Sequence, residues 1–274
     1  MLIRDALYYG KNYLRESKSP FLDSLVLLQN VTCLTKEKIL LSNELIPNDL
    51  FDNFCRLLKL RKENMPIQYI IQRAEFMGLK FYVDENVLIP RSDTEILVET
   101  VINFIGNKKL NVLDLCSGSG CISIALKKFC PNINIIGIDI SQKAIDIANK
   151  NAAINNVNVE FECGDIFEKF ISNIPPMFDI IISNPPYIIS DKINNLDANV
   201  KDFEPKIALD GGEDGLDFYR FITQKINHRC EIFFEIGYDQ AKSVCYMLNT
   251  NGFGNIKVIK DLAGLDRVIY ANRE

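Results

Sequence analysis

Short apolar segments alternate with helical segments from about residue 93 onward, and this alternation limits the folds that the chain can adopt. The predicted strands are residues 111–115, 133–138, 157–163, 178–183, 232–236, 256–259 and 267–271, and the first predicted helices between them are 119–129 and 141–155. Strands that are connected through helices form a mostly parallel sheet by right-handed crossovers. Several of these strands are nearly continuous runs of Ile and Phe, which favours burial on both faces of the sheet. The pattern therefore predicts an α/β domain.

The residues before this region have a different character. Residues 1–75 contain amphipathic, leucine-rich stretches and are predicted to form a small helical domain. Residues 76–92 carry alternating apolar residues on both sides of a polar segment at 84–86, which predicts a β-hairpin with its turn at that segment. We expect three parts: a helical domain over 1–75, a hairpin connector over 76–92 and the sheet domain over 93–274.

The composition excludes several classes of protein. With 47% hydrophobic and 24% charged residues, the chain can form a core and is not intrinsically disordered. The net charge of −5 argues against a protein that binds bulk nucleic acid, although residues 1–75 contain 11 Lys and Arg against 9 Asp and Glu. The single His and the eight cysteines, none in a Cys-x-x-Cys pair, form no familiar zinc spacing, so we expect no metal.

The sequence also bears on where the protein works. Arg4 and Asp5 interrupt the first apolar residues, which is unlike a signal peptide, and no apolar stretch reaches the length that a bilayer requires. Scattered cysteines beside apolar neighbours are typical of free thiols in a reducing compartment. We expect a cytoplasmic protein without a membrane partner.

The segment Asp114–Gly120 lies between a predicted strand and a predicted helix and is a candidate cofactor loop. Gly118 and Gly120 allow the backbone to approach a ligand, and the following helix offers free N–H groups. Ser123 stands where a dinucleotide fingerprint has its third glycine. Asp139 ends the next strand 19 residues after Gly120, where an acidic side chain can accept both hydroxyls of a ribose. The alternative is an ordinary tight turn, with Asp139 capping the next helix.

Asp165 and Ile166 follow the third predicted strand at the same edge of the sheet. Asp165 could accept the exocyclic amine of an adenine, with Ile166 against the ring face. The alternative is that Asp165 is a plain helix N-cap.

The tetrapeptide Asn184–Tyr187 follows the fourth predicted strand. Pro185 and Pro186 hold the backbone extended, and neither has an N–H that would compete for nearby carbonyls. Asn184 supplies a neutral acceptor, and Tyr187 supplies a flat wall with a polar tip. Together they can accept both hydrogens of a planar –NH₂ group. The alternative is a turn that only marks the end of the strand.

These two loops together resemble the class I S-adenosylmethionine-dependent methyltransferases that modify planar amino groups. Further segments resemble one family among them, the peptide chain release factor glutamine methyltransferases, and the resemblance extends over essentially the whole chain. Those segments are Ser19–Leu28, Pro66–Ile70, Phe76–Phe81, Val87–Glu95, Phe203–Tyr219, Phe234–Gly237, Asp261–Gly264 and Asp266–Arg267. Two positions depart from the family pattern: Ser92 replaces a proline, which could loosen that loop, and Cys116 stands where glycine is common, which could shift cofactor affinity.

The resemblance implies a Rossmann-like seven-stranded methyltransferase domain, mostly parallel with a C-terminal antiparallel strand. It implies methyl transfer from S-adenosylmethionine to the side-chain nitrogen of the glutamine in the Gly-Gly-Gln motif of class I release factors. The family's cofactor contacts are carried over to this chain by position, and Asp165 is added from its place in the sequence. The expected cofactor contacts are then Cys116, Ser117, Gly118, Ser119, Gly120, Asp139, Asp165, Ile166 and Asn184. The expected substrate contacts are Asn184, Pro185, Pro186 and Tyr187, of which Asn184, Pro185 and Tyr187 are the expected catalytic residues.

Three alternatives differ in what they require. A DNA adenine N6-methyltransferase would flip its base into the same pocket but needs a basic face, which a chain of net charge −5 does not suggest. A catalytically silent binding module would bind the cofactor and form no product. A nicotinamide dehydrogenase is disfavoured because Ser123 breaks the fingerprint. We expect a monomer that binds release factors and makes no direct contact with nucleic acid.

Overall fold

The computed structural model describes residues 1–170 and 172–274, and these form two compact units. The smaller unit contains Met1–Gln72 together with Asp197–Phe203, and the larger contains Arg73–Leu196 and Glu204–Glu274. No helix among the described residues is long and apolar enough to cross a membrane.

The smaller unit is helical. Its elements are α1 (Ile3–Tyr13), α2 (Pro20–Thr32), α3 (Lys36–Leu41), α4 (Asn48–Lys62), α5 (Ile67–Ile71) and α10 (Ala198–Lys201). Pro20 occupies the first position of α2, where its missing N–H costs nothing, and the Thr35 side chain caps α3 by accepting from Lys38 N at 3.4 Å. Buried leucines of α1, α2 and α4 pack with Phe54 into one core. This core is separate from the two cores of the larger unit.

The larger unit contains a seven-stranded sheet in the order β5-β4-β3-β6-β7-β9-β8. Its strands are β3 (Asn111–Leu115), β4 (Asn134–Asp139), β5 (Glu160–Cys163), β6 (Ile180–Ser183), β7 (Cys230–Glu235), β8 (Gly254–Lys260) and β9 (Asp266–Arg273). Strands β3 to β7 are parallel to one another, and β9 pairs antiparallel with both β7 and β8. The predicted α/β fold, a mostly parallel sheet with a C-terminal antiparallel strand, is confirmed.

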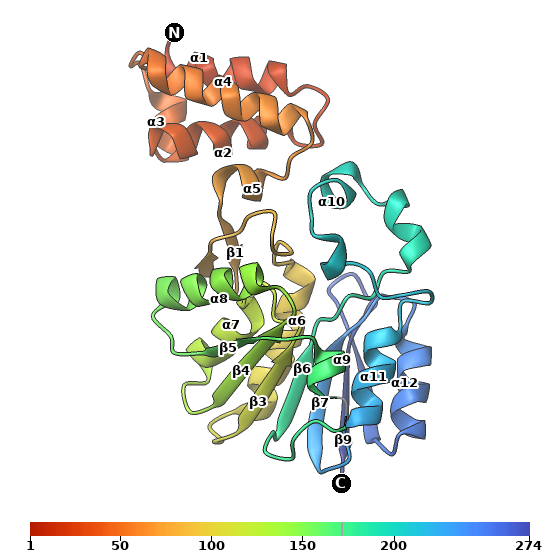
Figure 1. Ribbon diagram of the computed structural model, residues 1–274. Coiled ribbons are helices and arrows are strands. Elements are labelled where there is room, and N and C mark those ends of the chain that lie inside the picture. The colour runs from red at the N-terminus through yellow and green to blue at the C-terminus, as the bar shows by residue number, and fades with distance from the viewer. Residues whose placement is uncertain (171) are drawn as a thin grey trace. The chain divides into compact units, whose positions relative to one another are not determined.

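Helices cover both faces of this sheet, as Figure 1 shows. The remaining helical elements are α6 (Ser92–Ile105), α7 (Cys121–Phe129), α8 (Gln142–Asn155), α9 (Ile166–Lys169), η1 (Ser190–Asn195), η2 (Lys206–Ala208), α11 (Asp217–Lys225) and α12 (Ala241–Thr250). Successive residues of β6 point to opposite faces: Ile180 and Ile182 pack with α6 and α7, whereas Ile181 packs with α11 and α12. Burial on both faces explains why the central strands are continuous apolar runs.

The β-hairpin is present, but its turn lies earlier than the sequence predicted. Strand β1 (Ala74–Phe76) pairs antiparallel with β2 (Leu79–Phe81), and the turn is Met77–Gly78. Both turn residues have positive φ, 52° and 70°, which matches the twist of a two-residue hairpin and favours glycine at the second position. The polar segment 84–86 is instead a loop closed on Asp84, whose side chain accepts from Asn86 N at 2.9 Å.

Candidate functional site

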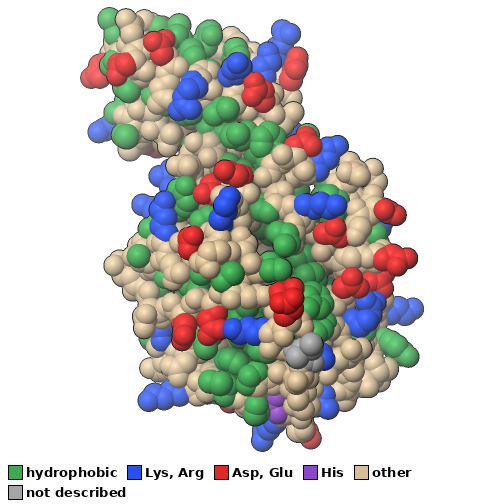
Figure 2. Space-filling model, viewed as in Figure 1, with side chains coloured by type: hydrophobic (Ala, Val, Ile, Leu, Met, Phe, Trp, Pro, Cys, Tyr) green, Lys and Arg blue, Asp and Glu red, His purple; other side chains and the backbone are tan. Residues whose placement is uncertain are grey.

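A cavity of about 280 Å³ lies at the carboxyl ends of the parallel strands, close to the lower limit of the roughly 300–1,000 Å³ typical of small-molecule sites. Seven of the predicted site residues line it: Cys116, Gly118, Asp139, Asp165, Ile166, Asn184 and Pro186. They come from the last residue of β4 and from the segments that follow β3, β5 and β6, because parallel strands bring their carboxyl ends to one edge. Most of the wall is apolar, and Figure 2 shows hydrophobic side chains gathered in a hollow of the larger unit.

Asp139 connects the loop after β3 to the loop after β4. One carboxylate oxygen accepts from Gly118 N at 2.8 Å, and the other accepts from Ser141 N at 2.9 Å. Burial raises the pKa of Asp139, and these backbone N–H groups oppose the shift. Helix α8 is capped by Ser141, whose Oγ accepts from Ala144 N, so Asp139 is not its N-cap. Each Asp139 oxygen retains lone-pair capacity toward the cavity that the residue lines.

The other predicted members of this loop lie behind the cavity wall rather than on it. Ser117, Ser119 and Gly120 are buried but do not line the cavity. Gly120 has a φ of +77°, and a Cβ at this position would meet Phe161 at 2.8 Å, so only glycine fits. Cys116 does line the cavity and has a φ of 62°, a left-handed conformation that glycine adopts more easily. This explains why glycine is common at that position in the family pattern.

Ser123, which replaces the third glycine of the dinucleotide fingerprint, has a structural role here. Its hydroxyl donates to a carboxylate oxygen of Asp114 at 2.6 Å, and both side chains are fully buried. Burial raises the pKa of Asp114 to about 7, and the Ser123 hydroxyl opposes this. The other Asp114 oxygen has no hydrogen-bond partner among the described residues.

Asp165 caps α9 and also lines the cavity. Its side chain accepts from Phe167 N at 2.8 Å, as the capping alternative predicted. The same side chain stands beside Ile166 at the cavity wall, so its capping role does not remove it from the site.

The segment Asn184–Tyr187 follows β6 at the same edge of the sheet, and its four residues do not all line the same cavity. Asn184 and Pro186 line the cavity, whereas Pro185 is buried behind it. Tyr187 lines a second cavity of about 380 Å³, together with Gln240 and Arg267. Burial raises the pKa of Tyr187 well above its ordinary value.

Both ends of this segment are anchored. Asn184 Nδ2 donates to the hydroxyl of Thr94 at 3.2 Å. At the other end, Gln240 Nε2 donates to the carbonyl of Tyr187 at 3.0 Å. The segment is therefore fixed by side chains from two other elements and is not a plain exposed turn.

Several residues of the site had not been identified from the sequence. The cavity is also lined by Asn86, Val87, Leu88, Ile138, Ile140, Ser141, Ala144, Gly164, Phe167, Pro205, Ile207, Ala208 and Phe218. Arg91 follows the first of these loops and bonds the buried Glu204, which precedes Pro205, so one ion pair joins two loops of the wall. Segments 87–95 and 203–219 belong to the family resemblance, so the sequence had singled out these loops. Nothing in the sequence indicated that they lie beside the candidate cofactor loop.

Comparison with known proteins agrees with this geometry. Residues 92–200 match the methyltransferase small domain, and residues 5–71 match the PrmC N-terminal domain. The T. thermophilus 16S rRNA N2 G1207 methyltransferase, solved with AdoMet and guanosine, shares the fold with a TM-score of 0.51 at 17% identity, over 74% of this chain and 50% of that one. Fold and site define a methyltransferase.

Full-length relatives identify the family. A release factor glutamine methyltransferase of Clostridium acetobutylicum is 43% identical over 286 residues, covering 100% of this chain and 99% of that protein. Another, of Thermodesulfovibrio yellowstonii, is 40% identical and covers 95% of this chain and 96% of that protein. The chain belongs to the release factor glutamine methyltransferase family. These relatives do not favour the alternative of a DNA adenine methyltransferase.

Proposed function

We propose that this protein transfers a methyl group from S-adenosylmethionine to the side-chain amide nitrogen of the glutamine in the Gly-Gly-Gln motif of class I release factors. One observation carries the proposal: Asn184 opens onto the same cavity as Gly118 and Asp139. A neutral acceptor for an –NH₂ group therefore stands beside a loop suited to a nucleoside. Membership of the family supports this choice of substrate.

The cavity fits the nucleoside part of S-adenosylmethionine. Asp139 has lone pairs for ribose hydroxyls, Asp165 can accept from the adenine amine, and Ile166 and Phe167 offer apolar surface to the ring. A Cβ built on Gly118 would meet nothing within 4 Å, so this part of the loop leaves open space for a ligand. Cys116, Ser117, Ser119 and Gly120 shape the same loop. When bound, the cofactor supplies a methyl group that is already activated by a sulfonium.

The protein then has to hold a poor nucleophile, the amide nitrogen, in line with the methyl group and the sulfur of the cofactor. The lone pair of an amide nitrogen is conjugated with its carbonyl, so attack requires reacting atoms held about 3–3.5 Å apart, and such positioning supplies roughly 7–11 kcal/mol. We assign this task to Asn184 Oδ1 and the Pro185 carbonyl as acceptors, and to Pro186 as a wall. Tyr187, expected from the sequence to be a second wall, lines the other cavity, so we assign it no wall of this one.

These acceptors also stabilise the transition state. The nitrogen gains positive charge as it attacks, and hydrogen bonds to neutral oxygens strengthen as that charge develops. The methylated amide cation that forms on attack is very acidic and can lose its proton to water, so no strong general base is required.

We assign the N-terminal helical domain, residues 1–75, to docking of the release factor, with residues 76–92 as connector and 93–274 as the catalytic domain. A lone glutamine offers little binding energy, so recognition has to use remote surface of the substrate. Because release factors act in translation, we place the reaction in the cytoplasm. We propose that the enzyme acts as a monomer.

Transfer of a radiolabelled methyl group from S-adenosylmethionine distinguishes the candidate substrates. Purified class I release factor, the same release factor with its motif glutamine changed to asparagine, and plasmid DNA are each incubated with the enzyme. We expect label only on the unchanged release factor. Label on DNA would favour the adenine methyltransferase, and cofactor binding without label on any of the three would favour a silent binding module.

A further inference from the structure

The hydroxyl of Thr94 lies directly behind Asn184. Thr94 is in the first turn of α6 and is 2% exposed, and its Oγ1 accepts from Asn184 Nδ2 at 3.2 Å. Because Asn184 lines the cavity, anchoring its nitrogen leaves its oxygen as the atom available to a ligand there.

A buried carboxyl group, Glu235, stands behind Thr94. It is the last residue of β7 and is 2% exposed, and one of its carboxylate oxygens has no hydrogen-bond partner among the described residues. Burial raises the pKa of Glu235 to about 7, whereas hydrogen bonding from Thr94, the cation of Arg267 and hydrogen bonding from Tyr187 favour the charged form. The charge of this carboxyl group is thus sensitive to Thr94 and to Tyr187, the last residue of the Asn184–Tyr187 segment.

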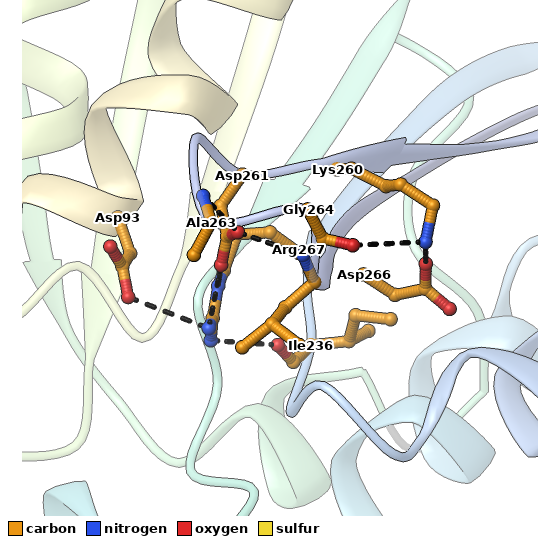
Figure 3. A network of polar contacts seen from close by, with 9 residues as sticks. Asp93, Ile236, Lys260, Asp261, Ala263, Gly264, Asp266 and Arg267 are labelled. Atoms are coloured by element: carbon orange, nitrogen blue, oxygen red, sulfur yellow. Dashed lines mark hydrogen bonds and ion pairs between the residues drawn. The ribbon is translucent and has the colours of Figure 1, made fainter.

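Arg267 clamps the two elements that carry Thr94 and Glu235. Its guanidinium contacts Asp93, the neighbour of Thr94, at 3.4 Å and donates to the carbonyl of Ile236, the neighbour of Glu235, at 3.3 Å (Figure 3). Asp261 accepts from the same guanidinium at 3.1 Å. The start of α6 and the end of β7 are therefore held in fixed register next to Asn184.

The hydrogen bond between Asn184 and Thr94 gives the orientation of the amide. Asn184 Nδ2 is the donor and Thr94 Oγ1 is the acceptor, so the –NH₂ of Asn184 points toward Thr94. The cavity then faces a carbonyl oxygen, which can accept from a carboxamide –NH₂ but repels a carboxylate.

We propose that Thr94 is a positioning residue that holds the Asn184 amide with its oxygen toward the substrate, so that the site selects glutamine over glutamate. The inference deepens the proposed function and rests on it for the identity of the substrate. Its first test is therefore independent of any methyl acceptor.

That test follows the side-chain amide of Asn184 in enzyme labelled with ¹⁵N-asparagine, its signal assigned by its loss in Asn184→Asp. We expect one sharp pair of –NH₂ resonances in the wild type. Thr94→Val removes the hydroxyl at nearly constant volume and should broaden or shift this pair, whereas Thr94→Ser should restore it. Unchanged Asn184 resonances in Thr94→Val would overturn the proposal, whether or not the wild type methylates a release factor.

The second test separates turnover from binding. In Thr94→Val we expect kcat on release factor to fall about 10- to 100-fold while the affinity for S-adenosylmethionine, measured by calorimetry, stays within about twofold. Thr94→Ser, which keeps the hydroxyl, should recover most of the activity. Thr100→Val is the matched control, because that hydroxyl lies on the same helix and, among the described residues, donates to the carbonyl of Ile96 alone.

If Thr94→Val does not fold, Thr94→Ala carries the same expectation. Wild-type kcat in a folded variant without the hydroxyl would contradict the proposal. An equal loss of cofactor affinity would contradict it too, because that loss would indicate a purely structural role.

Discussion

Asp114 is a fully buried carboxyl group at the centre of the sheet, with a pKa that burial raises to about 7. The unfolded chain releases this proton near the ordinary value of 3.8, so between the two values the native state binds more protons than the unfolded state. The contribution of Asp114 to stability is therefore most favourable at low pH and decreases as the pH rises toward 7.

Asp114→Asn removes this titration and leaves an oxygen that can still accept from Ser123. We compare the free energies of unfolding of the variant and the wild type. The value for the variant minus that for the wild type should rise by about 3 kcal/mol between about pH 5 and about pH 8. Urea unfolding at the two pH values measures the difference. Gln142→Ala, on the exposed face of α8, removes no ionisable group and is the control, which should show no such change with pH. An equal offset for Asp114→Asn at both pH values would mean that Asp114 is not protonated by burial.

Single residues differed in how well the sequence identified them. Asp139 and Asn184 were identified because each directly follows a predicted strand, and parallel strands place such residues at one edge. Thr94 could not be identified in this way, since it is 90 residues from Asn184 and the contact depends on where α6 packs. Glu235 ends an apolar strand but has no local pattern that predicts which face its side chain takes.

At the scale of elements, Asn151 joins three parts of the larger unit. It lies in α8 and is fully buried, its Nδ2 donates to the carbonyls of Tyr82 and Ser119 at 3.0 Å each, and its oxygen accepts from Tyr82 N at 2.7 Å. One side chain thereby ties the segment after β2 and the glycine loop to a helix.

Asn151→Ala would leave these buried backbone groups without partners and should lower the free energy of unfolding by about 3 kcal/mol. Asn149→Ala is the control, because that exposed side chain bonds, among the residues that the structure describes, just the carbonyl of Ile145 in its own helix. Denaturant titration of both variants measures the effect. If Asn151→Ala and Asn149→Ala had equal free energies of unfolding, the Asn151 hydrogen bonds would not be needed to hold the loop.

The elements of the sheet were predictable because their signal is strong and local. The strand predicted over 111–115 matches β3, and the other strand boundaries differ by three residues or fewer, since apolar runs between glycines and polar residues mark buried strands. The hairpin was misplaced because the turn Met77–Gly78 has only one turn-forming residue, whereas residues 84–86 have the polar composition of a turn.

At the scale of the whole molecule, the division into two units allows docking and chemistry to be tested apart. The larger unit contains every residue that lines the cavity of about 280 Å³, and the smaller has its own apolar core. We expect deletion of residues 1–72 to abolish methylation of intact release factor while binding of S-adenosylmethionine persists. Calorimetry measures the binding and shows that the remaining unit is folded. Unchanged methylation would refute a docking role for the N-terminal helices.

The central claim is that Asn184 immobilises a glutamine carboxamide beside the cofactor cavity. Tandem mass spectrometry of release factor treated with wild type or with Asn184→Ala, at saturating cofactor, tests it most directly. We predict one added methyl group on the motif glutamine with the wild type. With Asn184→Ala we predict a loss of turnover of about 100-fold or more, with nearly unchanged cofactor affinity. Equal turnover by the two enzymes, or a methyl group on another residue, would contradict the account.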